Sequence, residues 1–228
     1  MSGREILSPS ASLRCEVGAA EALVEGSSGS SWTTREKRRL QGWPDAGPPD
    51  NVIALASSQI GGWEAKVECR PRQHGEQAGL YAYADETSWV KFVVEGAAPH
   101  SEDASAATAQ LILASQHDGV PTLVGKQPLP DFGGALSLRL TVRADGASAE
   151  ASYRLPGSDD DAWRPMPRGL GWLRKDELAG RPYGSLEPDD PRGQQTAVAA
   201  LPAGWRPALV TEQWSSDLPK AEVRFADF

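Results

Sequence analysis

Two neighbouring stretches of the sequence place aromatic, amide and charged side chains at alternate positions, the spacing of one face of a β-strand. Aromatic rings pack on the apolar C–H face of a sugar, and amide and charged groups hydrogen-bond its hydroxyls. The intervening residues, as in Val90, Phe92 and Val94, predict the opposite, core-facing side. The pattern therefore predicts a ligand-binding sheet face made by Gln77, Tyr81, Tyr83, Trp89, Lys91 and Glu95.

The same pattern is also compatible with a face that only packs. A partly covered sheet uses aromatic residues and Lys–Glu pairs across neighbouring strands for packing alone. As a binding site, the face is expected to be the exposed, concave side of a sheet. Gln110 and Arg139 have the polar parity of their own strands and could join it. Trp172, in an irregular stretch, could contact a ligand or pin its own loop to the core.

Acid–base catalysis is the second chemistry that these residues could support. Glu95 would be the acid or base, and Lys91 or Arg139 would stabilise developing charge. Retaining glycosidases hold two carboxylates about 5–5.5 Å apart and inverting ones about 6.5–9.5 Å. Glu64 and Glu68 on one strand would be about 13 Å apart, at about 3.3 Å per residue. A structural Lys91–Glu95 ion pair is the alternative. A second acid near Glu95 would have to come from another strand, with Glu150 and Glu212 as candidates.

The composition argues against several classes of protein. The chain has 228 residues and a net charge of −8, whereas a nucleic-acid-binding protein needs a basic face. No apolar run reaches the roughly 18 residues of a membrane span. Cys15 and Cys69 make neither a disulfide framework nor a zinc site. The first residues lack the apolar segment of a signal peptide, so we expect a cytoplasmic protein without nucleic-acid or membrane partners.

Strand periodicity dominates the rest of the chain. Leu136, Leu138 and Leu140 share one parity, an Asp-Gly turn follows at 145–146, and a second strand resumes at 147–155. Many short strands without a convincing helix predict a sandwich, jelly roll or barrel. The other predicted strands are 11–17, 52–58, 62–70, 77–84, 88–95, 108–116, 206–214 and 220–226.

Two irregular stretches interrupt this rhythm. We expect one β-sandwich domain over residues 1–228, with long loops at about 25–50 and 164–195. Long loops in compact domains are usually either functional or disordered. Residues 175–178, Lys-Asp-Glu-Leu, are compatible with a short helix within 164–181.

Residues 77–95 also carry a more specific pattern, with Gln-Ala-Gly-Leu, then Asp85 in an acidic turn, then Trp-Val-Lys and Glu95. This segment resembles the signature of a concanavalin A-like jelly-roll family of unknown function that includes regulation-of-enolase-like proteins. It is also similar to the C-terminal sandwich module of family-43 β-xylosidases. The flanking segments that fit the same resemblance are 62–67, 138–140, the hairpin at 144–163, and 223–228.

The resemblance implies an all-β fold, a concanavalin A-like lectin/glucanase jelly-roll β-sandwich of two antiparallel sheets. Folds of this kind often hold a structural Ca²⁺ ion, and the resemblance implies Asp227, near the closing strand, as its ligand. The resemblance does not define the function, because this fold hosts lectins, glycanases and inert modules.

Three functions are therefore compatible with the sequence. The leading hypothesis is a lectin-like sandwich that binds a carbohydrate or small polar molecule on its concave face without catalysis. The first alternative is an enzyme that acts on a glycan or small metabolite in the same groove. The second is a regulatory protein that binds a metabolic enzyme, as the resemblance to enolase regulators implies.

Overall fold

The computed structural model describes the chain as strands joined by turns and short connections. Every regular element within the described residues is a β-strand. None of these residues belongs to a helix long and apolar enough to span a membrane. The described residues are 5–7, 15–18, 21–25, 52–55, 61–72, 75–96, 109–130, 132–157, 162–168, 195–213 and 222–228.

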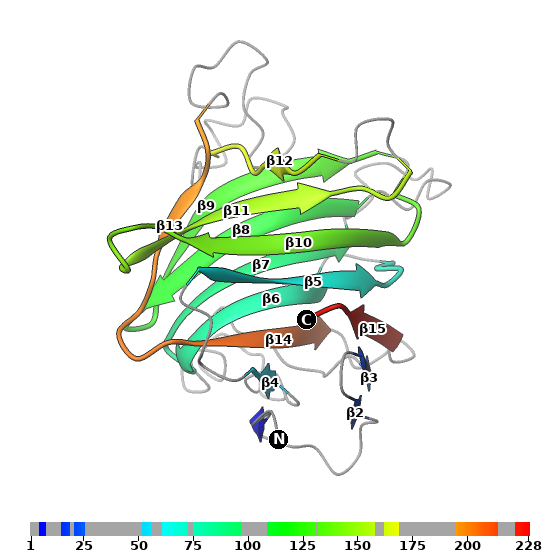
Figure 1. Cartoon of the computed structure of the whole chain (residues 1–228), viewed down its shortest axis with the longest axis horizontal. Coiled ribbons are helices and arrows are strands. Elements are labelled where there is room, and N and C mark those ends of the chain that lie inside the picture. Colours follow the sequence, from blue (N-terminus) through cyan, green and yellow to red (C-terminus); the bar gives the residue numbers. More distant parts are fainter. Residues whose placement is uncertain are drawn as a thin grey trace, which may run out of the picture.

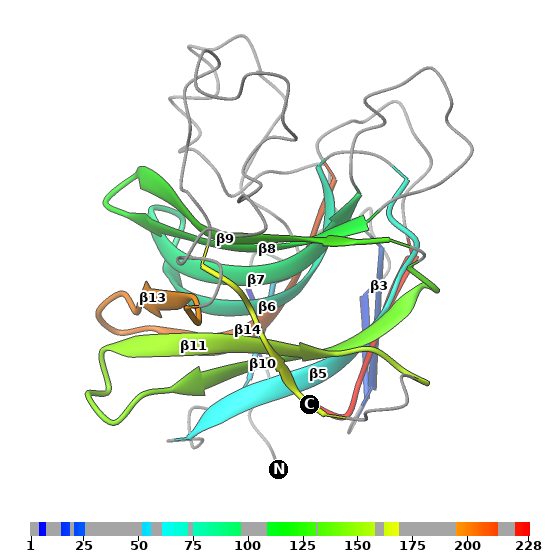
Figure 2. The same ribbon diagram turned by 90° about the horizontal axis from the view of Figure 1, so that it is seen from above.

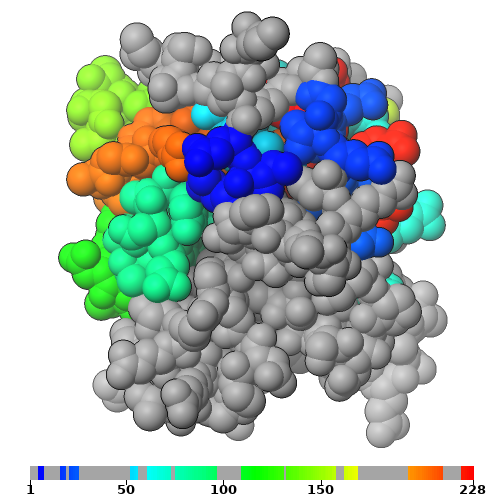
Figure 3. Space-filling view, turned by 90° about the horizontal axis from the view of Figure 1, so that it is seen from below, coloured from blue at the N-terminus to red at the C-terminus, as the bar shows by residue number. Residues whose placement is uncertain are grey.

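The first sheet, sheet A, has seven antiparallel strands. Its short edge strand β1 lies at the molecular surface, the darkest blue segment of Figure 3, and exposes 36% of Ile6. In order across the sheet, the strands are β1 (Glu5–Leu7), β4 (Val52–Ala54), β14 (Arg206–Gln213), β6 (Glu76–Asp85), β7 (Ser88–Gly96), β8 (Ala109–His117) and β9 (Val120–Leu129).

The second sheet, sheet B, has eight strands, and its pairs are also antiparallel. Strand β13 (Val198–Ala200) lies off the main path and pairs with β11 (Figure 1). In order, the remaining strands are β12 (Arg164–Pro165), β11 (Ser148–Arg154), β10 (Ala135–Val142), β5 (Gly62–Glu68), β15 (Glu222–Ala226), β3 (Glu21–Glu25) and β2 (Cys15–Val17).

The two sheets form layers that face each other across one apolar core (Figure 2). Leu80 and Phe92 from sheet A, and Val67 and Leu138 from sheet B, are completely buried in it. Burying such side chains contributes about 1.5–3 kcal/mol each. In Figure 2, β6 and β7 curve with their concave side turned away from sheet B. The predicted sandwich of two antiparallel sheets, and the predicted core parity of these strands, are confirmed.

Most predicted strands are present with shifted ends, but strand β9 was not predicted from the sequence. This strand contains Pro121, Gly125 and Pro128, residue types that argue against a strand. It is the last strand of sheet A in the described part of the chain. An edge strand tolerates proline wherever the missing N–H would point away from its only neighbour, which explains why the composition was misleading.

Gly79, in the middle of β6, is the glycine of the Gln-Ala-Gly-Leu pattern. A Cβ atom there would lie 2.3 Å from the carbonyl oxygen of Phe92 on β7 and 2.9 Å from a methyl group of Leu138. Only glycine therefore allows β6 and β7 to approach this closely, which supports the register on which the site depends.

The two predicted long loops lie mostly outside the described residues. Of 25–50, only Glu25 is described, and it ends β3. In the second stretch, residues 164–165 form strand β12, and Pro167 makes a bridge with Thr196. Residues 175–178, on which the expected short helix was based, lie outside the described residues, so that helix stays a prediction.

Candidate functional site

The candidate site lies on the outer, concave face of sheet A, where four neighbouring strands are in register. Gln77 on β6 stands opposite Glu212 on β14 and Glu95 on β7, and Glu95 stands opposite Gln110 on β8. Antiparallel register places residues opposite one another on the same face. Lys91 lies on the same face of β7, beyond Val93 and opposite Tyr81. It completes the polar row, which consists of Gln77, Lys91, Glu95, Gln110 and Glu212.

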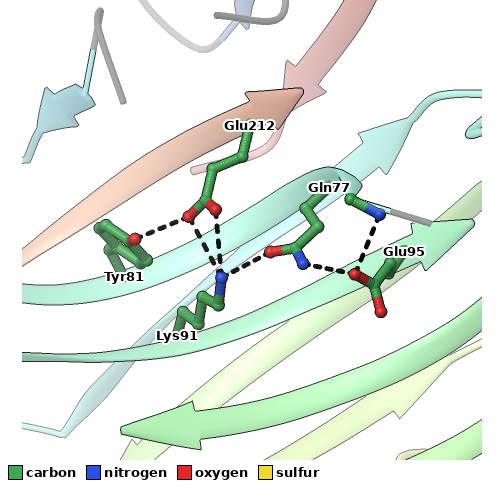
Figure 4. Close-up of polar contacts among 6 residues, drawn as sticks. Gln77, Tyr81, Lys91, Glu95 and Glu212 are labelled. Carbon is green, nitrogen blue, oxygen red and sulfur yellow. Dashed lines mark hydrogen bonds and ion pairs between the residues drawn. The ribbon is translucent and has the colours of Figure 1, made fainter. Parts of the chain in front are cut away.

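Lys91 joins one half of the polar row (Figure 4). Its Nζ donates to both carboxylate oxygens of Glu212, each at 3.2 Å, and to Oε1 of Gln77 at 2.6 Å. Tyr81 donates its hydroxyl to Oε1 of Glu212 at 2.8 Å. The ammonium is therefore held between a carboxylate and an amide oxygen.

Glu95 accepts hydrogen bonds in the other half. Nε2 of Gln77 donates to its Oε1 at 2.5 Å, and the backbone N–H of Gly75 donates to the same atom at 3.2 Å (Figure 4). Nε2 of Gln110 donates to Oε2 at 2.7 Å. Gln77 thus bridges the two halves: its oxygen accepts from Lys91 and its nitrogen donates to Glu95.

Three aromatic side chains, Tyr81, Tyr83 and Trp89, form an aromatic group beside the row. The ring of Tyr81 stacks on those of Tyr83 and Trp89, with both centroid distances at 5.9 Å and interplanar angles of 5° and 10°. Nζ of Lys91 lies 5.3 Å from the Trp89 ring, within range of a cation–π contact.

The face is buried, which corrects the expectation of an exposed one. Tyr81, Trp89 and Lys91 are 0% exposed and Glu95 is 2% exposed. Alternation of residue types assigns a side chain to a face but carries no information on whether that face meets solvent. An apolar cluster that includes Val93 accompanies the polar and aromatic residues here.

Burial governs the electrostatics of the lysines on this face. Loss of hydration lowers the pKa of Lys91, and the carboxylates of Glu212 and Glu95 oppose that shift. Lys126 of β9 has its pKa lowered for the same reason, with Glu95 again opposing. The carboxylate of Glu95 therefore acts on the pKa of both the buried Lys91 and the half-buried Lys126.

Gln116 belongs to the same face and was missed. It lies on β8 opposite Trp89, and it is 0% exposed. Its Nε2 donates to the carbonyl oxygen of Glu86 at 3.2 Å, whereas its Oε1 has no hydrogen-bond partner among the described residues. Its alternation with Gln110 in β8 was the signal that could have identified it.

Arg139 does not join this face. It lies on β10 of sheet B, where it forms an ion pair with Glu64 on β5, with Nε to Oε2 at 2.7 Å, and its guanidinium lies 3.8 Å from the centre of the Trp163 ring. The expected contribution of Arg139 to the site is therefore wrong. Glu150 is likewise on sheet B, near Arg143, so Glu212 is the acid that lies near Glu95.

Two further residues were expected at sites, Trp172 at the ligand and Asp227 at a calcium ion. Trp172 lies outside the described residues. Asp227 follows β15 and is exposed, and its nearby charged group is Lys66. Calcium takes about six to eight oxygen ligands. The described residues bring no group of three or more His, Cys, Asp or Glu side chains together, and a calcium ion at Asp227 that also uses backbone carbonyls stays a prediction.

Cys69 follows β5 with its thiol buried. Burial raises its pKa to about 12, and the nearby charge of Glu76 adds to the shift. A thiol held protonated at neutral pH is a poor nucleophile and a poor metal ligand. Cys69 is therefore part of the core.

The two central acids come from different strands, and protein groups already engage both of them. Glu95 and Glu212 lie on strands separated by β6, so their backbones are about 10 Å apart at about 4.8 Å per strand spacing. Both oxygens of each carboxylate already accept hydrogen bonds from protein donors.

Comparison with known proteins identifies this architecture as a concanavalin A-like sandwich. A family model described as the β-xylosidase C-terminal concanavalin A-like domain matches residues 59–178, just over half of the chain. The chain belongs to that family, and the resemblance noted in its sequence is confirmed. A search of curated proteins finds no match.

Similar solved structures show the same fold. The GH43 protein BlXynB from Bacillus licheniformis has a TM-score of 0.52 at 14% identity, covering 91% of this chain and 33% of that one. GH43B from Bacteroides ovatus, from a xyloglucan locus, has a TM-score of 0.52 at 10% identity, covering 90% and 32%. A functionally unknown Saccharomyces cerevisiae protein has 0.49 at 14% identity, covering 99% and 93%. This chain thus spans about a third of the GH43 structures. It is a sandwich related to carbohydrate-active enzymes.

Proposed function

We propose that this chain is a lectin-like module that binds a carbohydrate or related small polar molecule on the outer face of sheet A, without catalysis. The observation that carries the proposal is the polar row. Its five side chains are each 6% or less exposed, yet they lie on the outer face of the sheet and not in the apolar core. Amide, carboxylate and ammonium groups are those that bind sugar hydroxyls, and the aromatic group stands beside them.

Stability alone is a weak reason for such a row. Desolvating a lysine and a carboxylate is expensive, and replacing a buried ion pair with apolar residues of similar volume is often neutral or stabilising. Neighbouring positions on the same face carry Val93, Ile112 and Val210, so apolar residues are accommodated there. A ligand that uses the polar atoms supplies the missing reason for retaining them.

Gln116 supports the proposal from the aromatic end of the face. A buried acceptor without a hydrogen bond costs about 1–3 kcal/mol. A ligand hydroxyl placed against Trp89 could donate to Oε1 of Gln116 and recover that energy. In a purely structural face, no group among the described residues would offset the cost of this oxygen.

The burial of the row has a kinetic consequence. Binding must expose the polar atoms and exchange some of the internal hydrogen bonds of Glu95 for bonds to ligand hydroxyls. Association that needs such a change is slower than the usual 10⁵–10⁷ M⁻¹s⁻¹, on the order of 10⁴ M⁻¹s⁻¹ or less. We expect slow, single-exponential binding in stopped-flow measurements of the tryptophan fluorescence, to which Trp89 contributes.

The test is a thermal-shift and calorimetry screen with xylo-, gluco- and galacto-oligosaccharides. A ligand at 100 times its Kd contributes about 2.7 kcal/mol, which raises Tm by roughly 5–10 °C at this size. The key variant is Gln116→Leu, and Gln127→Leu on the neighbouring β9 is the matched control. We expect Gln116→Leu to keep or raise the Tm of the free protein and to weaken sugar binding, whereas the control binds normally.

Two outcomes would overturn the proposal. If no sugar shifts the Tm of the wild-type chain at millimolar concentration, the face is structural. If a bound oligosaccharide is cleaved, as product analysis would reveal, and Glu95→Gln abolishes the cleavage, the protein is an enzyme and not a lectin-like module.

A further inference from the structure

A second candidate site lies on the other sheet, at the end of β5. An open groove with a volume of about 650 Å³ is formed there by residues from separate parts of the chain. Arg70 and Arg72 follow β5, Arg224 lies on β15, and Gly133 and Gly134 precede β10. This volume lies within the range of small-molecule sites, about 300–1,000 Å³. The groove contains none of the residues of the polar row or the aromatic group.

The groove is locally basic although the chain as a whole has a net charge of −8. Three guanidinium groups line it, together with two carboxylates, those of Glu68 and Glu222. Lys66 holds Glu68 at 2.6 Å and lowers its pKa, with Arg224 contributing to the shift. Much of the negative charge of Glu68 is thus already compensated from outside the groove.

Arg70 lines the groove with its guanidinium available for a ligand. It forms no ion pair with any residue in the described ranges, in contrast to Arg72, whose Nη2 contacts Oε1 of Glu76 at 2.6 Å. Glu76 is only 2% exposed. Arg72 is therefore anchored to the protein interior, while Arg70 is exposed at the groove.

The backbone at Gly134 positions Arg70. Gly134 has a φ of +93°, which is unfavourable for other residues, and its carbonyl accepts the N–H of Cys69 at 2.9 Å. A Cβ at position 134 would lie 3.3 Å from both Cγ and Nε of Arg70. The arginine stem thus lies directly over the glycine, and any larger residue would displace it.

From these observations we infer that the groove binds a small anionic ligand through a carboxylate or phosphate group. The planar guanidinium group of arginine presents two N–H groups side by side, which match a pair of oxygen atoms of a carboxylate or phosphate. The hydrogen bonds between them are short and charge-assisted. Arg70 and Arg224 are the principal ligand-binding residues, and Arg72, whose charge is paired with Glu76, lines the groove from a fixed position. This site is independent of the proposed sugar-binding face.

Binding is tested by calorimetry with inorganic phosphate, glucose 6-phosphate, glucuronate and, as the neutral control, glucose. We expect one or more of the anions to bind and glucose not to bind at this site. Arg70→Gln and Arg224→Gln should each weaken binding by about tenfold or more, because each removes a charge-assisted contact. Arg143→Gln, an exposed arginine elsewhere on sheet B, is the matched control and should bind normally.

The anion series distinguishes the chemistry of the ligand. Binding of phosphate and glucose 6-phosphate without glucuronate assigns a phosphate site, and the reverse assigns an acidic-sugar site. Lys91→Met must leave anion binding intact, which separates this site from the polar row. The inference is overturned if none of the anions binds, or if Arg143→Gln weakens binding as much as Arg70→Gln does. Unchanged Tm values for both groove variants would exclude unfolding as the cause of a loss.

Discussion

The outer faces of the two sheets both carry charged residues that form ion pairs between strands, but in different surroundings. On sheet B, Arg139 pairs with Glu64, and their side chains are 37% and 43% exposed. On sheet A, Lys91 pairs with Glu212, and both side chains are 0% exposed. The same alternating pattern of residue types thus produces a hydrated ion pair on one sheet and a desolvated network on the other.

This difference decides what each pair contributes. Exposed ion pairs are worth about 0–1 kcal/mol, because water competes for both charges. A buried pair has lost its hydration, so its members depend on each other and on amides such as Gln77. The polar row should consequently be sensitive to single substitutions, and the outer face of sheet B should tolerate them.

The largest expected effect is that of Glu212→Ala. It removes the carboxylate that accepts from Lys91 and Tyr81, and it leaves a desolvated ammonium beside an apolar gap. We expect a loss of about 3–5 kcal/mol in the free energy of unfolding, measured in urea. The matched control, Glu64→Ala on sheet B, should cost about 1 kcal/mol or less. Equal losses for the two variants would mean that the row is effectively hydrated.

A double substitution separates stability from binding. Replacing the pair with apolar residues of similar size, Lys91→Met with Glu212→Leu, removes both charges together. We expect this variant to be more stable than Glu212→Ala, with a coupling energy between the two positions of about 0.5–3 kcal/mol. Its sugar-dependent Tm shift should nevertheless be absent. A double variant that still binds sugar would remove the polar row from the proposed site.

The sequence allowed the faces to be predicted but not their surroundings. Alternation of Leu80 and Phe92 with Gln77 and Lys91 was sufficient to assign core and outer sides, because successive side chains of a strand point to opposite faces. Burial of Lys91 could not be predicted, since it depends on what lies over the sheet. The proximity of Glu212 also depends on strand order, which brings β14 beside β6 from far along the chain.

Arg139 is a second case in which the sequence predicted the orientation of a side chain but not its surroundings. Its parity was assigned correctly as outward, yet it belongs to sheet B, because parity does not say which sheet contains a strand. Gln116 was missed for a related reason. Its parity is that of Gln110, but it is of interest because its Oε1 has no hydrogen-bond partner among the described residues. A missing hydrogen bond is visible only in the three-dimensional structure.

A smaller effect concerns pH. The pKa of Lys91 is lowered in the folded protein by burial, so the unfolded chain binds more protons between that lowered pKa and 10.5. Stability linked to this group therefore rises as pH increases through that window. We expect the difference in unfolding free energy between the wild-type chain and Lys91→Met to shift in favour of the wild type over this range.

Arg143→Met on sheet B is the control for that titration. Its side chain is 48% exposed, so its replacement should give a difference from the wild type that is independent of alkaline pH. If the difference in unfolding free energy between the wild type and Lys91→Met is also independent of pH, the ammonium of Lys91 has the same proton affinity in the folded and unfolded chains. The contrast between the two faces would then have no electrostatic basis.

The smallest expected effect lies in the exposed turn that joins β10 and β11 on sheet B. Asp145 accepts hydrogen bonds there from the backbone N–H groups of Ala147 and Ser148, at 2.9 and 3.0 Å, and from the Ser148 hydroxyl. The bond from Ala147 is the main cause of its lowered pKa. A depressed carboxyl pKa contributes stability above the unfolded value of about 3.9, and this contribution is lost as pH falls through the folded pKa.

Asp145→Ala should therefore lower Tm by no more than a few °C at neutral pH. The difference from the wild type should vanish in acid, once Asp145 is protonated in both the folded and unfolded chains. Asp145→Asn keeps one side-chain oxygen as a hydrogen-bond acceptor, so its Tm should lie between those of the wild type and Asp145→Ala. A loss for Asp145→Ala as large as that for Glu212→Ala would contradict the division of the molecule into a hydrated face and a desolvated one, because a solvent-exposed carboxylate would then contribute as much as a buried one.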